Sequence, residues 1–526
     1  MTREAPVTAV EAVRWRRRSF RRPLAALLLA LFLIGLLVTL FGLYAWWRFS
    51  GETTAYHADI EEHFKYGSIG SEPDSGLPYW IWRALPALFE EELDGRGYEA
   101  FGFLYERDRE GRPRDLPIGI SRREVRGVEL VWLNCAVCHA GTWRAAADAP
   151  REIVLGMPAN GFDLYGFIRF LFDAVVDERF STERLMAAME AAGADFDWLE
   201  TKAYRHLVIP TVRDELLKRR AQLLPLLAVQ PPWGPGRVDT FNPYKLLTFG
   251  KSLDDLEPRE RIGPADLPSI WLQGPRGDAE MQLHWDGNNR SLAERNLSAA
   301  IGAGVTEETV DHRAIERVAD WLRDLPPPPS PLTEGLDSES VAEGERIYAR
   351  TCLRCHGRQG REGGYVFEGE DLGEVVPLAE IGTDRGRFDS YTAEMAELQK
   401  GLFAGDPEYR FRHFEKTEGY ANHPLDGLWL RAPYLHNGSV PTLEALLMPP
   451  ARRPHRFLRG LDVIDREAGG FLAPACPARS EGSGLLPGTD ICFHTSTRGN
   501  GSGGHDYGTD LAPAEKAALV AYLKTF

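Results

Sequence analysis

Residues 135–139 read Cys-Ala-Val-Cys-His, and residues 352–356 read Cys-Leu-Arg-Cys-His. This spacing is typical of covalent c-type haem attachment, because both thiols bond the porphyrin and the adjacent histidine ligates the iron. The predicted attachment residues are Cys135, Cys138, Cys352 and Cys355, and the predicted proximal iron ligands are His139 and His356. The sequence therefore predicts two covalently bound haem c groups and redox chemistry.

Two other uses of a Cys-x-x-Cys pair fit this chain less well. A zinc site needs closely spaced partner pairs that together supply four ligands, and the two pairs here are more than 200 residues apart. A thioredoxin-like dithiol needs no histidine after the second cysteine and does not normally recur in one chain.

An uncharged apolar run precedes the haem motifs at residues 23–47. At about 1.5 Å per residue it can cross a hydrocarbon core of about 30 Å. Six arginines lie just before it, and excess positive charge marks the cytoplasmic side. We expect a single-pass anchor in the inner (cytoplasmic) membrane, with a cytoplasmic N-terminus and periplasmic haem domains. The alternative is a cleaved signal peptide, although the Trp46-Trp47 pair suits a membrane interface better than a small-x-small cleavage site.

The net charge of the 526-residue chain is −16, and seven Arg against two Glu give residues 1–22 a net charge of +5. The rest of the chain carries −21, which argues against nucleic acid as a partner and suits a basic electron donor or plain solubility. Cys476 and Cys492 are the two cysteines outside the haem motifs. In an oxidising compartment we expect them to form a disulfide around the loop-like stretch 477–491, which would contribute about 3 kcal/mol.

The predicted fold class is mainly α, with two cytochrome c-like haem domains that carry long loop insertions after one transmembrane helix. A helix before Cys352, and helical patterns over 314–325 and 512–523, support one such fold in each half. The expected segments are a basic tail (1–22), the anchor (23–47), an N-terminal extension or lid (48–126), the first haem domain (127–325), a Pro-rich linker (326–340) and the second haem domain (341–526).

Several further motifs carry a resemblance to a known family. They are residues 66–72, 132–139, 156–160, 234–243, 284–287, 425–439 and 504–508. On these residues the chain resembles the bacterial di-haem cytochrome c peroxidases and the methylamine-utilisation di-haem enzyme. The branch most similar to it is the rubber-oxygenase-like di-haem branch.

The resemblance implies a division of labour between the two haems. The N-terminal haem activates H2O2 or O2, and the six-coordinate C-terminal haem supplies electrons from a small donor protein such as a cytochrome c or a cupredoxin. For the sixth ligand of the second haem it offers His505 first and Met448 second, with His436 and His494 also open. For His436 a structural role is the stronger interpretation.

The resemblance also implies residues for the reaction and for a calcium ion. Glu72 is the candidate distal proton donor, with an ordinary loop carboxylate as the alternative. Trp285 is the candidate for lining the distal pocket or relaying charge, with core packing as the alternative. One Ca²⁺ would be held near Asn160, Arg431 and Pro433, largely by backbone carbonyls, a choice of oxygen ligands that suits calcium.

The predicted function is therefore a peroxidase-type di-haem oxidoreductase, which reduces H2O2 at the first haem. Two alternatives stay open: a di-haem dioxygenase of an apolar substrate, and an electron-transfer cytochrome without a substrate of its own.

Overall fold

The computed structural model describes residues 9–54, 56–360, 364–476 and 491–526, with side chains from residue 23 onward. It is mainly helical, and it divides into two compact units. One unit comprises residues 1–54 and 123–129, and the other comprises residues 55–122 and 130–526. Most of the expected loop 477–491 lies outside the described residues.

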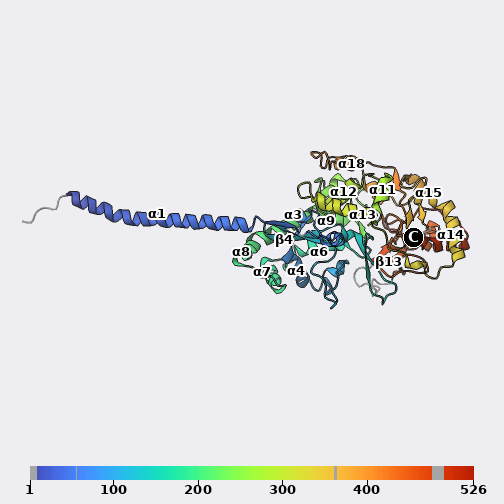
Figure 1. The fold of residues 1–526 in the computed structure, drawn as a ribbon, viewed down its shortest axis with the longest axis horizontal. Coiled ribbons are helices and arrows are strands. Elements are labelled where there is room, and N and C mark those ends of the chain that lie inside the picture. The colour runs from blue at the N-terminus through green and yellow to red at the C-terminus, as the bar shows by residue number, and fades with distance from the viewer. Residues whose placement is uncertain (1–8, 55, 361–363, 477–490) are drawn as a thin grey trace, which may run out of the picture. The chain divides into compact units, whose positions relative to one another are not determined.

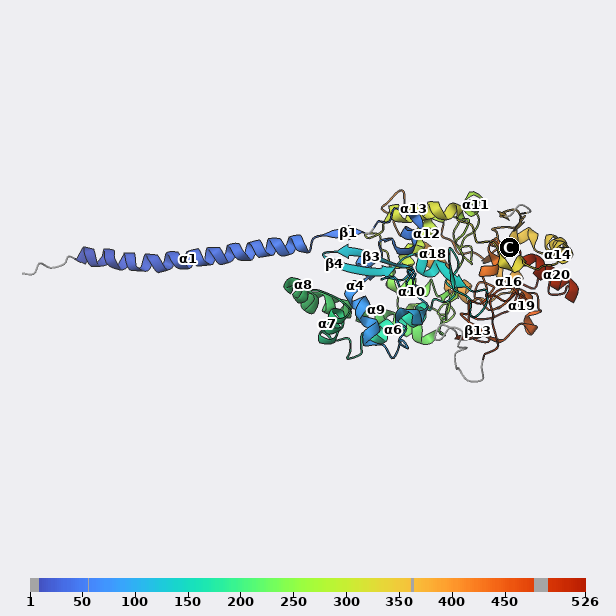
Figure 2. The ribbon, with the colours of Figure 1, turned by 60° about the horizontal axis from the view of Figure 1, so that its bottom comes forward.

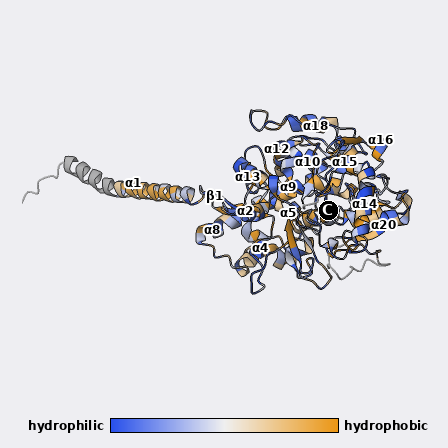
Figure 3. Cartoon of the chain, turned by 45° about the vertical axis from the view of Figure 1, so that its right-hand side comes forward, coloured by the Kyte–Doolittle hydropathy of each residue, from blue (hydrophilic) through white to orange (hydrophobic). Residues whose placement is uncertain are grey.

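The first unit is built on the long helix α1 (Ala9–Arg48). Its stretch Pro23–Arg48 has a mean hydropathy of 2.9, and none of it is buried. In Figure 3 most of this stretch has the orange colour of hydrophobic residues. The helix is long and apolar enough to cross a membrane, and it is compatible with an anchor or with a signal peptide. Strand β1 (Glu52–Thr54) pairs antiparallel with residues 123–125 of β3 (Ile120–Val125).

In the second unit, the first haem motif lies beside a crossed pair of helices. The short helix α2 (Ile60–Tyr66) packs against α13 (His312–Asp324), where the rings of Phe64 and Trp321 lie 5.2 Å apart. The motif helix α5 (Ala136–His139) joins the same apolar cluster through Ala136. The pattern over 314–325 predicted α13, whereas α2 falls in the segment that the sequence assigned to an extension.

The second haem motif has a longer version of the same pair. Helix α14 (Ser338–Thr351) crosses α20 (Pro513–Leu523), and the two lie side by side in Figures 1 and 2. Gly344 of α14 is in such close contact that a Cβ there would overlap the Ala518 carbonyl oxygen. The motif helix α15 (Leu353–His356) follows α14 directly. The helices expected on both sides of this motif are therefore present.

Further helices and short strands fill the rest of the second unit. The other α-helices are α3 (Glu72–Ser75), α4 (Tyr79–Leu88), α6 (Leu164–Ala174), α7 (Thr182–Ala191), α8 (Trp198–Ala203), α9 (Ile209–Val229), α10 (Asn242–Leu247), α11 (Gln273–Asp278), α12 (Leu292–Gly302), α16 (Leu378–Ile381), α17 (Gly386–Ser390), α18 (Ala393–Lys400) and α19 (Leu443–Leu446). The antiparallel strand pairs are β2 (Leu77–Pro78) with β4 (Val128–Leu133), β5 (Ala140–Trp143) with β6 (Glu152–Leu155), β7 (Arg237–Val238) with β8 (Ala265–Asp266), β9 (Arg358–Gln359) with β10 (Tyr365–Val366), β11 (Val375–Pro377) with β12 (Gly419–Ala421), and β13 (Arg456–Arg459) with β14 (Ile491–His494). Short 3₁₀ and π turns, among them η6 (Pro450–Arg452), connect several of them.

The proline run between the two halves is packed against its surroundings. The Leu272 amide donates to the Leu325 carbonyl at 2.9 Å, and the Trp429 indole donates to the Pro328 carbonyl at 3.2 Å. The Ser330 hydroxyl donates to the Lys524 carbonyl near the end of the chain at 2.6 Å. These contacts hold the segment 325–330 in place along its whole length.

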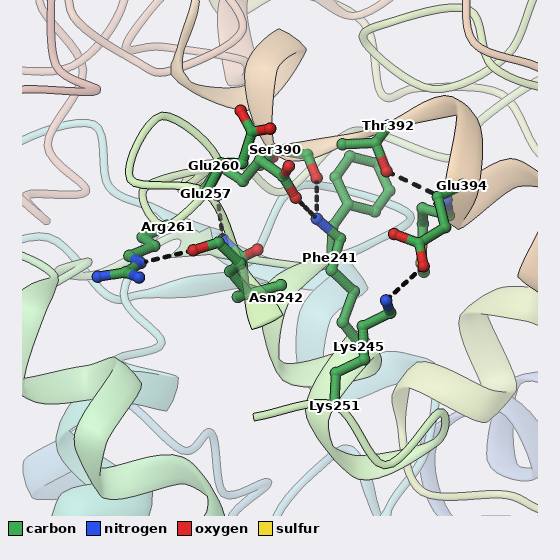
Figure 4. A network of polar contacts seen from close by, with 12 residues as sticks. Phe241, Asn242, Lys245, Lys251, Glu257, Glu260, Arg261, Ser390, Thr392 and Glu394 are labelled. Carbon is green, nitrogen blue, oxygen red and sulfur yellow. Dashed lines mark hydrogen bonds and ion pairs between the residues drawn. The ribbon is translucent and has the colours of Figure 1, made fainter. Parts of the chain in front are cut away.

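A polar network joins the insertions of the two halves (Figure 4). The buried Lys245 ammonium donates to Glu260 at 2.9 Å and to the Ser390 carbonyl at 2.7 Å. Nearby, Lys251 forms an ion pair with Glu394. Lys245 and Lys251 belong to the first half, and Ser390 and Glu394 belong to the second. These contacts therefore connect the two halves.

Candidate haem sites

Asn134 shapes the turn into the first haem motif. Its side-chain oxygen accepts from the Ala136 amide at 3.0 Å, and its amide group donates to the Gly67 carbonyl at 3.0 Å. The residue therefore fixes the start of α5 and ties it to the end of α2. Cys135 and Cys138 are free thiols, each partly accessible, on this turn.

The His139 imidazole is oriented by a backbone acceptor. Nδ1 lies 3.0 Å from the Pro268 carbonyl oxygen, which assigns the ring proton to Nδ1 and leaves Nε2 as the ligating nitrogen. Burial lowers the pKa of His139 to about 4, and the positive charge of Arg295 on α12 acts in the same direction. The imidazole is thus neutral at physiological pH, as iron ligation requires.

The second motif presents its histidine in the same way. Nδ1 of His356 lies 2.8 Å from the His423 carbonyl oxygen, and the pKa of His356 is lowered by burial. The His505 ring lies near the His356 ring, and the centroids of the two rings are 6.1 Å apart. With metal–imidazole bonds of about 2 Å, two axial imidazoles place their ring centres about 6 Å apart. The separation therefore fits one iron between His356 and His505.

His505 is partly buried in a glycine-rich loop. Its backbone has a φ of +50°, and its amide donates to the Ile381 carbonyl at 2.9 Å. Nδ1 is buried without a hydrogen-bond partner, and burial followed by the fields of His356 and Arg453 lowers the pKa of His505 to about 3. A neutral imidazole held at this distance from a haem-motif histidine has the chemistry of a metal ligand.

The residues present fit covalent haem at both motifs. Each motif offers two free thiols and a neutral histidine whose Nδ1 is held by a carbonyl. At the second motif, the facing His505 adds a ring at the separation expected for a second axial ligand. Among the described residues, no second histidine ring contacts the His139 ring.

The other candidates for the sixth ligand have different contacts. The His436 ring stacks on Tyr420, with centroids 4.1 Å apart, and its carbonyl accepts from the Asp266 amide. His494 belongs to β14, where its Nε2 lies 3.2 Å from the Cys492 sulfur. The Met448 carbonyl accepts from Arg453 at 3.2 Å. Of the four candidates, His505 is the residue whose side chain contacts the His356 ring.

Glu72 is fully buried at the start of α3. One carboxylate oxygen accepts from the Ser68 hydroxyl at 2.7 Å, and the other accepts from the Ser121 hydroxyl. It is therefore not an exposed loop carboxylate. Both of its oxygens are engaged by serines, and the catalytic role stays a prediction.

Trp285 packs against His423, the residue whose carbonyl oxygen contacts His356 of the second motif. Its indole donates to the Asp266 carbonyl at 2.8 Å, and its ring meets the His423 ring edge-on, with centroids 5.5 Å apart. His423 is the residue whose carbonyl holds His356, and its own Nε2 lies 2.8 Å from the His284 carbonyl oxygen. The tryptophan is thus one residue away from the hydrogen bond on His356.

The predicted calcium residues have other contacts of their own. The side-chain oxygen of Asn160 accepts from the Thr142 amide at 3.1 Å, and its amide group donates to the Thr142 carbonyl at 2.9 Å. Arg431 forms a 2.7 Å ion pair with Asp426, and Pro433 follows a cis peptide bond. The calcium site stays a prediction. Cys476 and Cys492 are joined by a disulfide.

Sequence reasoning missed the residues that orient the ligands. Pro268 and His423 act through their carbonyl oxygens, which carry no side-chain signature. Arg295 and Arg453 look like ordinary surface arginines in the sequence, and no motif marked either of them. The run Arg452-Arg453-Pro454 close behind Met448 could have drawn attention to Arg453.

Comparisons with known proteins support haem binding by this chain. A family model described as "RoxA-like, cytochrome c-like" matches residues 419–458, which contain His423, His436 and Arg453. "Uncharacterized protein y4iM" of Sinorhizobium fredii (strain NBRC 101917 / NGR234) is 30% identical over 295 residues, covering 49% of this chain and 64% of that protein. "Uncharacterized protein y4iJ" of the same strain is 28% identical over 493 residues, covering 75% of this chain and 76% of that protein. The chain thus spans less than two thirds of the length of the first relative. The match over 419–458 supports a RoxA-like cytochrome c domain, haem c binding and an oxidoreductase.

Proposed function

We propose that this chain is a membrane-anchored, extracytoplasmic di-haem oxidoreductase that reduces H2O2 at the His139 haem. Electrons would enter at the haem held by His356 and His505. The single observation that carries the proposal is the asymmetry of the two motifs. His356 faces a second imidazole at 6.1 Å, whereas among the described residues His139 has no such partner.

The asymmetry bears directly on the chemistry. A haem iron with one protein ligand has an open position for H2O2 or O2, whereas an iron between two histidines is suited to electron transfer. Reduction of one H2O2 to two waters consumes two electrons and two protons. A second redox centre in the same chain supports peroxide reduction, because it can supply electrons without leaving the protein.

Trp285 is the proposed relay between the two centres. Its ring contacts His423, whose carbonyl holds the His356 imidazole. At the first haem motif, Arg295 places a positive charge beside His139 and Cys135. That charge favours an anionic group near the first haem, either a haem carboxylate or the oxygen that gains negative charge in the reaction.

The proposal is tested with the haem-loaded full-length protein and reduced cytochrome c as donor. We expect two haems per chain, one high-spin and one low-spin ferric signal in electron paramagnetic resonance (EPR), and oxidation of the donor that depends on H2O2. A Cys352→Ser/Cys355→Ser variant keeps the first haem and is expected to lose donor-coupled turnover. Two low-spin signals together with no peroxide-dependent oxidation would leave an electron carrier as the better interpretation.

A dioxygenase of an apolar substrate is the second candidate, and the surroundings of Cys135 favour it. Cys135 packs against a cluster that contains Ile69, Leu297, Ala300 and Ile301, and Glu72 is already occupied by two serines. An apolar reaction site without a free acid would suit O2 chemistry better than acid-assisted peroxide cleavage, and this cluster is the apolar region that Cys135 contacts. Incorporation of both atoms of ¹⁸O2 into an apolar substrate, with no external electron donor, would select this candidate.

A further inference from the structure

Arg453 is a buried arginine that contacts the loop of His505. It directly follows the turn η6, and its side chain is nearly inaccessible. Its guanidinium donates to five backbone carbonyls, which lie in two separate segments. The acceptors are Leu446 (3.2 Å), Met448 (3.2 Å), Ser502 (2.6 Å), Gly504 (2.7 Å) and His505 (3.1 Å).

This arrangement depends on the shape of the arginine side chain. A guanidinium offers five N–H donors in a rigid planar fork, whereas lysine offers three donors from one rotating atom. Carbonyl oxygens converge on all three nitrogens of Arg453, so its contacts use Nε, Nη1 and Nη2 together. The side chain therefore joins the end of α19 and the residues that follow it to the segment that carries His505.

The His505 segment needs such support, because its backbone is strained. His505 has a φ of +50°, and Gly504 before it has a φ of +70°. A non-glycine residue in this region persists where surrounding contacts fix it. In addition to Arg453, the amide hydrogen bond to the Ile381 carbonyl holds the segment.

We infer that Arg453 is a positioning residue, which holds His505 at the distance that places its imidazole opposite His356. The inference rests on the proposed ligation of the second haem by His356 and His505. Arg453 itself touches neither the iron nor the reacting molecule. Its loss would free the loop, so that His505 would dissociate more easily and an external ligand would replace it.

The test uses the haem-loaded full-length protein with Arg453→Met and Arg453→Lys, read by EPR and by the rate of cyanide binding at the second haem. In Arg453→Met we expect the low-spin signal of the second haem to lose at least half of its intensity and cyanide binding to accelerate at least tenfold. Arg453→Lys keeps the charge but not the fork, so an intermediate effect is expected. If Arg453→Met does not accumulate as haem-loaded protein, Arg453→Lys decides.

Two companion variants separate the possible outcomes. The adjacent Arg452 is exposed, so Arg452→Met is the matched control and should leave both readouts unchanged. His505→Ala should abolish the low-spin signal; if it does not, the proposed ligation fails and the inference fails with it. If His505→Ala abolishes the signal while Arg453→Met and Arg453→Lys keep wild-type EPR and cyanide rates, the ligation stands and the inference is overturned. A lower thermal midpoint alone, with both readouts unchanged, would likewise mean a structural role only.

Discussion

Both carboxylate oxygens of Glu72 accept hydrogen bonds from serine hydroxyls in a fully buried environment. The carboxylate stabilises the fold, because it links Ser68 to Ser121, which lie far apart in the sequence. Replacing it with glutamine keeps one of these acceptors and puts an amide donor in place of the other.

We expect Glu72→Gln to lower the free energy of unfolding by about 1–3 kcal/mol and to change peroxide turnover less than tenfold. Ser68→Ala, which removes one of the two donors, is the matched variant and should cost less. Denaturant unfolding and steady-state turnover measure the two effects. A loss of turnover of about 10²–10⁴ without a loss of stability would instead establish Glu72 as the catalytic acid.

His63 predicts a dependence of stability on pH. It is buried on α2 with both ring nitrogens unpaired, and burial lowers its pKa from 6.5 to about 4. The unfolded chain therefore binds a proton between pH 6.5 and 4 that the folded chain does not, so stability falls as the pH falls through this window.

From this residue alone we expect about 2 kcal/mol less stability at pH 5 than at pH 7.5. His63→Leu should remove that part of the loss, which denaturant unfolding at the two pH values would show. The exposed His455 provides the control, since His455→Leu should leave the pH dependence unchanged. An identical pH dependence in His63→Leu and the parent would contradict the assignment.

At the same scale, the haem-motif residues were readable from the sequence and their partners were not. The spacing of Cys135, Cys138 and His139 is a covalent requirement of the cofactor, so it appears in the sequence directly. The carbonyls of Pro268 and His423 come from distant segments through peptide groups that every residue has. Their positions depend on tertiary structure, which a single sequence does not display.

Among the elements, the contact of α14 with α20 depends on one glycine. A Cβ at Gly344 would overlap the Ala518 carbonyl oxygen, so the two helix backbones approach each other at this point. Gly302 at the end of α12 is the natural comparison, because a Cβ added there would meet no other atom within 4 Å.

We expect Gly344→Ala to lower the free energy of unfolding by about 1–3 kcal/mol, although alanine is the better helix former. Gly302→Ala should be neutral or should stabilise by up to about 1 kcal/mol, because nothing opposes the added methyl group. Thermal or denaturant unfolding of the two variants measures the difference. Equal effects at both positions would mean that the helices can separate at no cost.

Helices beside a haem motif or at the end of a half were predicted from their apolar pattern, whereas others were missed, among them the 21-residue α9 and the short α2. The patterns before Cys352 (343–351) and at the end of the chain (512–523) were recognised, and α14 and α20 occupy those places. Helix α2 has only seven residues, too few for a periodic pattern, so its segment reads as part of an extension. Its place is fixed by packing against α13 rather than by its own sequence.

For the whole molecule, the apolar stretch of α1 is compatible with a membrane anchor or with a signal peptide, and the two can be told apart. Pro23–Arg48 is long enough to cross a bilayer, and its side chains are exposed. If it is retained as an anchor, the full chain should stay in the membrane fraction after alkaline carbonate washing. A variant that replaces residues 1–50 with a cleavable leader should be released in soluble form with both haems attached.

N-terminal sequencing of the mature protein provides the complementary measurement. A mature chain that keeps residues 23–48 would agree with an anchor. A soluble mature chain that begins after this stretch would identify a signal peptide instead.

The packed proline run has a consequence for the kinetics of the proposed reaction. Hydrogen bonds from Trp429 to the Pro328 carbonyl and from Ser330 to the Lys524 carbonyl hold in place the proline segment that connects the two halves. Electron tunnelling falls steeply with distance, so a hinged connecting segment would spread the intramolecular transfer over many rates. With this connecting segment fixed, the edge-to-edge distance between two bound porphyrins would be constant. A flash-photolysis trace of the electron transfer should then decay as a single exponential, with a rate constant that solvent viscosity does not change.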